Sequence, residues 1–231
     1  MFYNKTNQIT RKRYKMNIDF RIPALLIGYC IGLIQTAYIV GRMVAKIDIR
    51  ERGTGNAGAA NIFEIIGARA ATVVLITDVL KGILAFIVCA ILWNGGGTFM
   101  GDGSVLPGFY GALGAILGHS FPFYLKFRGG KGFASAMGLM IAVDIWMFFI
   151  ALGAGLIILL ITRYTTVATL AVTAAMPITL HVFAYSPEVI VMSVFVVALV
   201  WYLHRANISK LLNGEEKKFE FKYLVNRRRG R

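Results

Sequence analysis

Long apolar runs separated by short polar connections are the dominant pattern along this chain. A helix needs roughly 17–25 predominantly apolar residues to cross a bilayer. Six runs have such a length or exceed it, and they cover residues 22–44, 70–93, 107–125, 133–162, 166–184 and 187–203. The run over 133–162 is too long for one crossing, and Asp144 divides it into two helices. The pattern therefore predicts an all-α integral membrane protein with seven transmembrane helices.

Lysine and arginine are distributed unevenly among the connections between these helices. Together with Arg42 at the end of the first run, the first, third and fifth connections and the segment after residue 203 contain 18 Lys and Arg residues, whereas the second, fourth and sixth connections contain none. Cytoplasmic loops are enriched in Lys and Arg. We therefore expect the C-terminus in the cytoplasm and, with seven crossings, the N-terminus outside.

The first 21 residues oppose this orientation, because they hold six Lys and Arg residues that favour the cytoplasmic side. Two interpretations remain open. Either the segment lies on the lipid headgroups as a basic interfacial extension, or translation starts at Met16, which removes five of the six. The expected organisation is a basic extension over 1–21, a transmembrane domain over 22–212 and a basic cytoplasmic tail over 213–231.

Composition narrows the class of partner. The 231 residues are 57% hydrophobic and 16% charged, with a mean hydropathy of +0.66, which excludes an ordinary soluble domain. The net charge of +14 favours anionic membrane lipids over nucleic acid, since no soluble module presents a groove-reading element. Cys30 and Cys89 lie inside apolar runs without the spacing of a metal site, so we expect no metal.

Two glycine-rich stretches fall on the predicted cytoplasmic side. Residues 52–61 read RGTGNAGAAN, a loop whose free backbone N–H groups suit a phosphate; a tight turn at the membrane surface is the alternative. Residues 126–132 read KFRGGKG, where Gly130 permits close approach and Lys131 supplies a point charge. A lysine that snorkels to the interface is the alternative here. A Walker site is excluded, because no Ser or Thr follows Lys131 and no strand precedes it.

Further polar groups lie at helix ends or inside the apolar runs. Thr166 follows Arg163 in an interfacial connection, and His204 and Asn207 share one helical face. Asp78 and Lys81 lie three residues apart within one helix, so they either satisfy each other or take part in chemistry. His119 either lines a site or bridges helices.

In this order along the chain, the motifs resemble the acyl-phosphate-dependent glycerol-3-phosphate acyltransferases of bacterial plasma membranes, the PlsY-type family. The resemblance covers residues 28 to 219. The stretches that carry it most specifically are residues 48–50 (DIR), 53–61 (GTGNAGAAN), 77–82 (TDVLKG), 118–122 (GHSFP), 127–132 (FRGGKG) and 204–208 (HRANI), with Leu211 and Gly214.

The resemblance implies a seven-helix bundle whose active site opens to the cytoplasmic leaflet of the plasma membrane. An acyl phosphate there gives its acyl group to the 1-hydroxyl of glycerol 3-phosphate, and lysophosphatidic acid and inorganic phosphate result. No cofactor and no covalent enzyme nucleophile are expected, and direct attack assisted by substrate phosphate is our hypothesis. The expected catalytic residues are Thr54, Lys131, His204 and Asn207. The expected substrate-binding residues are Arg52, Gly55, Asn56, Asn61, Arg69, Lys81, His119, Gly130 and Thr166.

Several positions depart from the family pattern. Glu64 stands where the family ordinarily has a basic residue that contacts phosphate, and an anion there should repel glycerol 3-phosphate. Leu33 and Gln35 replace a serine and a proline, Ala60 replaces a threonine, and Lys210 replaces an arginine. A divergent paralogue with another acceptor and a regulatory subunit therefore remain alternatives. A transporter of anionic metabolites is a third, although its binding groups should lie near the bilayer midplane.

Overall fold

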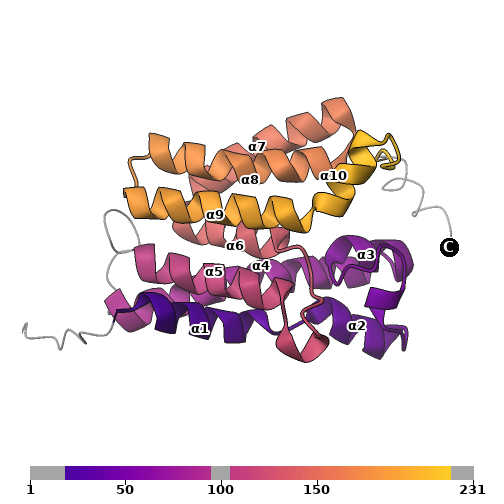
Figure 1. The fold of residues 1–231 in the computed structure, drawn as a ribbon, viewed down its shortest axis with the longest axis horizontal. Helices are drawn as coiled ribbons and strands as arrows, with labels where there is room; N and C mark the ends of the chain where they lie inside the picture. The colour runs from indigo at the N-terminus through magenta and orange to yellow at the C-terminus, as the bar shows by residue number, and fades with distance from the viewer. Residues whose placement is uncertain (1–18, 95–104, 220–231) are drawn as a thin grey trace, which may run out of the picture.

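The computed structural model describes residues 19–94 and 105–219, and within these ranges every regular element is a helix (Figure 1). The predicted all-α class is thereby confirmed. Most of the predicted basic extension, all but the edges of the second connection, and the last part of the tail lie outside the described residues. The elements are α1 (Arg21–Gly32), α2 (Thr36–Val44), η1 (Ile49–Glu51), α3 (Ala59–Ile65), α4 (Ala68–Asn94), α5 (Leu106–Ser120), η3 (Phe123–Leu125), α6 (Phe133–Val143), α7 (Ile145–Thr162), α8 (Thr165–Val182), α9 (Pro187–Leu203) and α10 (Arg205–Leu212).

Asp144 separates α6 from α7, as its position in the apolar run predicts. Its side chain accepts hydrogen bonds from the backbone N–H groups of Trp146, at 2.7 Å, and of Met147, at 3.2 Å. These are the free donors at the start of α7, and a capping carboxylate satisfies them. One acidic residue thus ends one helix and begins the next.

The first apolar run is not one helix, in contrast to the continuous span expected over 22–44. It breaks between α1 and α2, where Gln35 is buried at 1% exposure. The Gln35 Nε2 group donates to the carbonyl oxygens of His119, at 2.9 Å, and of Gly118, at 3.3 Å. The break is therefore stabilised by the end of α5, which lies far away in the sequence.

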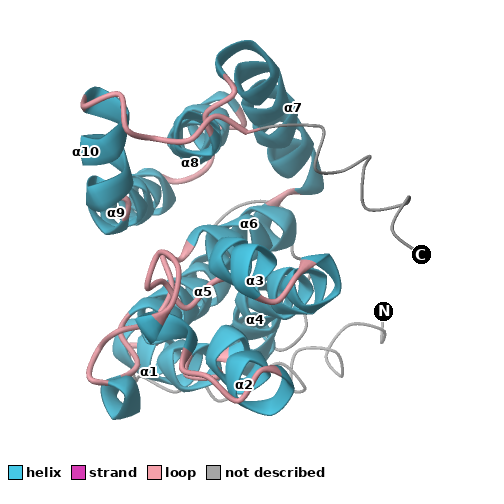
Figure 2. Cartoon of the chain, turned by 90° about the vertical axis from the view of Figure 1, so that its right-hand side faces the viewer, coloured by secondary structure: helices cyan, strands magenta, loops and turns pink. Residues whose placement is uncertain are grey.

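The helices form two groups that lie side by side (Figure 2). Helices α1 to α6 make up one group and α7 to α10 the other, with α6 next to the second group. A common apolar core joins them through residues such as Phe109, Leu139, Met176 and Val196. The two groups therefore form one packed body.

Several outer helix faces are apolar, as lipid contact requires. Four helical stretches in the described residues are long and apolar enough to cross a bilayer, and they are Arg21–Val44, Ala68–Trp93, Ile145–Thr162 and Thr165–Val182. The pair α9 and α10, bent by 61°, gives a fifth if it is counted as one span. The protein is thus a multi-pass membrane protein.

Candidate active site

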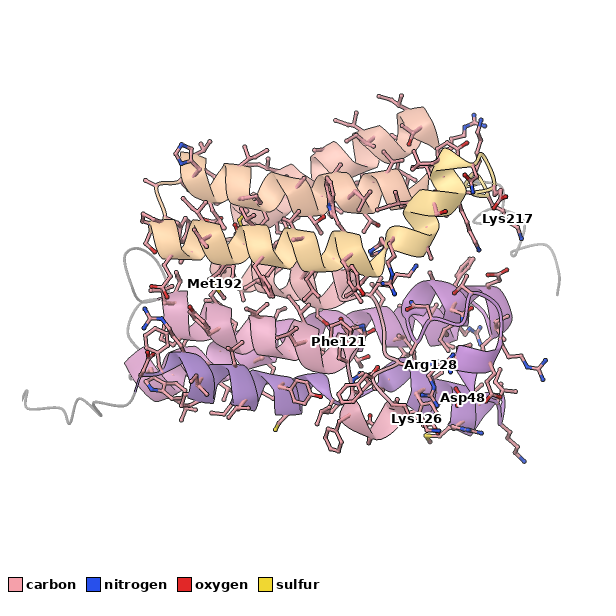
Figure 3. All side chains as sticks on the ribbon, in the orientation of Figure 1. Asp48, Phe121, Lys126, Arg128, Met192 and Lys217 are labelled. Atoms are coloured by element: carbon pink, nitrogen blue, oxygen red, sulfur yellow. The ribbon has the colours of Figure 1, made fainter. Side chains whose placement is uncertain are left out.

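A cavity of about 270 Å³ lies where three segments meet at one end of the bundle. Figure 3 places Asp48, Arg128 and Lys217 toward this end and Met192 toward the other. The first segment is the loop before α3, the second follows α5, and the third is the junction of α9 and α10. The lining residues are Thr54, Gly55, Asn56, Ser120, Phe121, Phe127, Arg128, Gly129, Gly130, Lys131, Tyr202, Leu203 and Arg205.

The loop before α3 takes its shape from Asn61, which is fully buried. The Asn61 Oδ1 atom accepts the backbone N–H of Thr54 at 2.9 Å, and Nδ2 lies 2.9–3.0 Å from the carbonyl oxygens of Ile49, Arg52 and Asn56. All polar atoms of this amide are therefore engaged with the loop itself. The resemblance suggests substrate contact for Asn61, but its contacts in the structure are those of a residue that shapes the loop.

Asp48 and Arg50 form an ion pair at the start of the same loop, and Arg50 also joins this loop to the second segment of the site. The Asp48 carboxylate accepts from the side chain of Arg50 at 2.7 Å and from its backbone N–H at 3.0 Å. Arg50 also donates to the carbonyl oxygen of Leu125, at 2.9 Å. The Arg50 guanidinium lowers the pKa of Asp48 to about 2, so the carboxylate stays charged at neutral pH. This bridge was not predicted as part of the site, although both residues stand in one of the specific motifs.

The second segment lies directly on the end of α5. The backbone N–H of Gly130 donates to the His119 carbonyl oxygen at 3.1 Å, and that of Gly129 donates to the Ser120 carbonyl oxygen at 3.2 Å. A Cβ atom added to Gly130 would lie 2.0 Å from Nε2 of His119. Gly130 is thus required for close approach to the imidazole ring.

The ionisable groups inside the bundle pair with one another behind this segment. The Lys81 ammonium lies 2.7 Å from the Asp78 carboxylate and 3.4 Å from Nδ1 of His119, and it also donates to the Ile34 carbonyl oxygen. Asp78, Lys81 and His119 are all less than 5% exposed, and none of them lines the cavity. Of the two interpretations for Asp78 and Lys81, the structure supports mutual pairing.

Lys131 enters the cavity from the second segment and meets α10. Its ammonium donates to Oδ1 of Asn207, which joins the two helix groups at the site. Nδ1 of His204 lies 2.8 Å from the Val200 carbonyl oxygen, so this nitrogen carries the hydrogen and Nε2 remains an acceptor. His204 is buried between two lining residues, Leu203 and Arg205. The structure therefore brings Lys131, His204 and Asn207 together, as predicted from the motifs.

Other predicted residues lie away from the cavity. The Thr166 hydroxyl donates to Glu216 of the segment after α10. Arg69 is exposed and lines a different, mainly apolar groove of about 730 Å³ near Val40 and Val73. Arg52 and Glu64 are exposed and are not among the lining residues.

Sequence reasoning did not select several residues that line the cavity. Ser120, Phe121, Phe127 and Arg128 stand inside the specific motifs, so their motif membership was an available signal. Arg205 stands in the motif over 204–208, and Tyr202 lies two residues before it, so the position of this motif was the available signal for both. Three cationic side chains thus meet at the cavity, those of Arg128, Lys131 and Arg205.

Comparison with known proteins identifies the family. The family model for glycerol-3-phosphate acyltransferase matches residues 22–214. The chain belongs to this family. The glycerol-3-phosphate acyltransferase of Shouchella clausii is 36% identical over 209 residues, covering 87% of this chain and 97% of the relative. That of Thermoanaerobacter pseudethanolicus is 34% identical over 200 residues, covering 86% and 96%.

Two solved structures have the same fold as this glycerol-3-phosphate acyltransferase family member. The crystal structure of the integral membrane glycerol 3-phosphate acyltransferase PlsY (YgiH) in its glycerol 3-phosphate form gives a TM-score of 0.77 at 28% identity, covering 90% of this chain and all of that one. Its lysophosphatidic acid form gives a TM-score of 0.74 at 29% identity, with 87% and 96% covered. The likeness extends over nearly the whole chain.

Proposed function

We propose that this protein transfers a fatty acyl group from an acyl phosphate to the 1-hydroxyl of glycerol 3-phosphate, and so forms lysophosphatidic acid and inorganic phosphate. The observation that carries the proposal is the cavity itself, in which Arg128, Lys131 and Arg205 face a glycine-rich loop at the end of the bundle. Both substrates carry phosphate groups. Relatives named for this activity, and solved structures in glycerol 3-phosphate and lysophosphatidic acid forms, support the same conclusion.

The reaction needs phosphate binding and charge stabilisation more than a protein nucleophile. The hydroxyl oxygen of glycerol 3-phosphate attacks the acyl carbonyl carbon, and the bond from that carbon to the phosphate oxygen breaks. The hydroxyl proton goes to a substrate phosphate. In this scheme the backbone N–H groups and side chains of Thr54, Gly55 and Asn56 hold one phosphate, and Lys131 balances the charge that develops. Asn207 and His204 orient the acceptor.

A second group of residues shapes these loops and does not contact substrate. Asn61 shapes the loop before α3. Lys81 contacts His119, and the imidazole of His119 in turn lies against Gly130 of the segment after α5. Arg52, exposed beside the first loop, attracts anionic substrates through its charge. Arg69 lies at another groove, and we leave it outside the proposed site.

The proposed topology has seven crossings, with the N-terminus outside and the active site at the cytoplasmic face of a bacterial plasma membrane. The broken helix α1–α2 and helices α4 to α9 supply the crossings, although α5 and α6 have only 15 and 11 residues. The cavity lies at the end that carries the basic connections, which supports this orientation. A transporter is disfavoured, because the buried charges of Asp78 and Lys81 pair with each other.

The proposal is tested with purified protein, palmitoyl phosphate and labelled glycerol 3-phosphate. We expect labelled lysophosphatidic acid, and a loss of about 10²–10³-fold in kcat/KM for Lys131→Ala, because a charge that stabilises the transition state is removed. Lys126→Ala is the matched control, since this lysine is exposed on the same segment and does not line the cavity. Folded wild-type protein that gives no product would refute the assignment.

A further inference from the structure

The groove that Arg69 lines lies between α2 and the start of α4, two helices that are side by side (Figure 2). Its volume of about 730 Å³ exceeds that of the active-site cavity, and no residue lines both. Every lining residue except Arg69 is apolar. We call this feature the α2–α4 groove, and its lining residues are Val40, Val44, Ile66, Gly67, Ala68, Arg69, Ala70 and Val73.

An apolar stripe on α4 continues the α2–α4 groove along the helix. Val73, Ile76 and Leu80 follow Arg69 at spacings of four, three and four residues, so all four side chains share one helical face. The three apolar residues are 51%, 52% and 53% exposed. Because α4 is long and apolar enough to cross a bilayer, this stripe faces lipid. An acyl chain can therefore lie along α4 and enter the groove.

Arg69 gives the α2–α4 groove a charged end. Its side chain is exposed and forms no hydrogen bond or ion pair with another described residue, including Glu64 on α3. The first turn of α4 contains no acidic residue. A guanidinium presents a planar set of N–H donors that matches a phosphate group. The groove thus combines an unpaired phosphate-binding cation with an adjoining apolar track.

We propose that the α2–α4 groove binds an anionic phospholipid from the leaflet at this end of the bundle. The headgroup phosphate contacts Arg69, and one acyl chain lies along Val73, Ile76 and Leu80. Charge complementarity favours this occupant, because the uncompensated positive charge attracts lipids that carry a net negative charge. The site is separate from the active-site cavity, and the proposal does not depend on the acyltransferase function.

Native mass spectrometry of the full chain in detergent tests the headgroup contact. The probes are phosphatidylglycerol and phosphatidylcholine with the same acyl chains. We expect phosphatidylglycerol to bind about fivefold more tightly, since one arginine at a membrane surface contributes about 1 kcal/mol to the attraction of anionic lipid. In Arg69→Gln the two dissociation constants should become equal.

Arg163→Gln is the matched control, because Arg163 is an exposed arginine that does not line the groove. We expect this variant to keep the preference for phosphatidylglycerol. An equal loss of preference in both variants would show attraction by the overall positive charge and would overturn the proposal. Wild-type protein without a preference would overturn it as well.

Val73→Trp tests the path of the acyl chain, because the larger side chain occupies the groove at an exposed position and leaves Arg69 in place. We expect both lipids to bind about tenfold more weakly, the effect of losing about two buried CH₂ groups. Ile157→Trp, at an exposed position on α7, is the control and should bind as wild type does. Unchanged binding in Val73→Trp would overturn the proposed path.

Competition distinguishes the phospholipid from the other occupants. Palmitoyl phosphate also combines a phosphate with an acyl chain, and we expect it not to displace phosphatidylglycerol at concentrations that saturate the enzyme. Displacement would assign the groove to the substrate and overturn the proposal, as would a dimer whose lipid binding is the same in Arg69→Gln. Lipid binding is measured without turnover, so its outcome and that of the acyltransferase assay are independent.

Discussion

At the scale of single residues, Gly130 shows how the side chains behind the cavity control the loop in front of it. A Cβ atom at this position would lie 2.0 Å from the imidazole of His119. Gly130→Ala must therefore displace either the loop that carries Lys131 or the ring of His119, whose neighbours are Asp78 and Lys81. Misplacement by about 1 Å is enough to cost about 10²-fold in rate.

We accordingly expect Gly130→Ala to lose about 100-fold in kcat/KM. Gly153→Ala is the control, because a Cβ atom at Gly153 meets nothing within 4 Å. The same acyltransferase assay measures both variants, and a thermal melt in detergent confirms that they are folded. Full activity in Gly130→Ala would show that the loop can move without consequence.

The motifs in the sequence predicted which residues come close together better than they predicted what each residue contacts. Lys131, His204 and Asn207 meet as expected, yet Asn61 binds its own loop and Thr166 binds Glu216. A polar residue in a motif has the same identity whether it faces a ligand or the backbone. The two roles can be distinguished only by the contacts that the side chain makes in the folded structure.

At the scale of helices, α1 and α5 approach so closely that their backbones touch. A Cβ atom added to Gly28 would lie 1.8 Å from the carbonyl oxygen of Gly111, and one added to Gly114 would lie 2.2 Å from that of Leu25. Small residues at such an interface allow the close packing that holds membrane helices together. The same contact positions the end of α5, which carries His119 and to which the segment after α5 is hydrogen-bonded.

Gly28→Ala should therefore destabilise the protein as an overpacked core substitution does, by about 1–3 kcal/mol. The unfolding temperature in detergent should fall, whereas that of Gly153→Ala should stay close to wild type, since its added methyl group projects into open space. Equal melting temperatures for the two variants would contradict a tight α1–α5 interface.

Hydrophobic patterning predicted where the helices lie but not where they bend. The apolar runs gave helices at each expected place, and the division of the run over 133–162 at Asp144 was predicted from the position of this residue. The break at Gln35 could not be found in this way, because its partners Gly118 and His119 are more than 80 residues away. The same holds for the angle between α9 and α10.

At the scale of the whole molecule, the proposed seven crossings place successive connections on opposite faces of the membrane. Single cysteines can test this in a protein whose Cys30 and Cys89 are replaced by alanine. We expect Ala184→Cys, at an exposed position of the sixth connection, to react with a membrane-impermeant maleimide in intact cells, and Lys126→Cys to react only after permeabilisation. Labelling of both from the outside, or of neither, would contradict the proposed topology.

Charge distribution predicted the end of the bundle at which the cavity lies, because the basic connections and the cavity share that end. It could not predict that residues 213–219 contact the start of α8, since composition describes this segment as a hydrophilic tail. The contacts between residues 163–166 and residues 216–219 leave no periodic pattern in the sequence.

The four hydrogen bonds of Asn61 have a consequence for how this family can diversify. One buried amide fixes four backbone positions at once, and any other side chain would lose several of these contacts together. The conformation of the loop before α3 therefore depends on Asn61 as a whole, and its four bonded positions cannot change one at a time. Changes in acceptor preference are open mainly to side chains such as Thr54 and Asn56, which face the cavity and leave that scaffold intact.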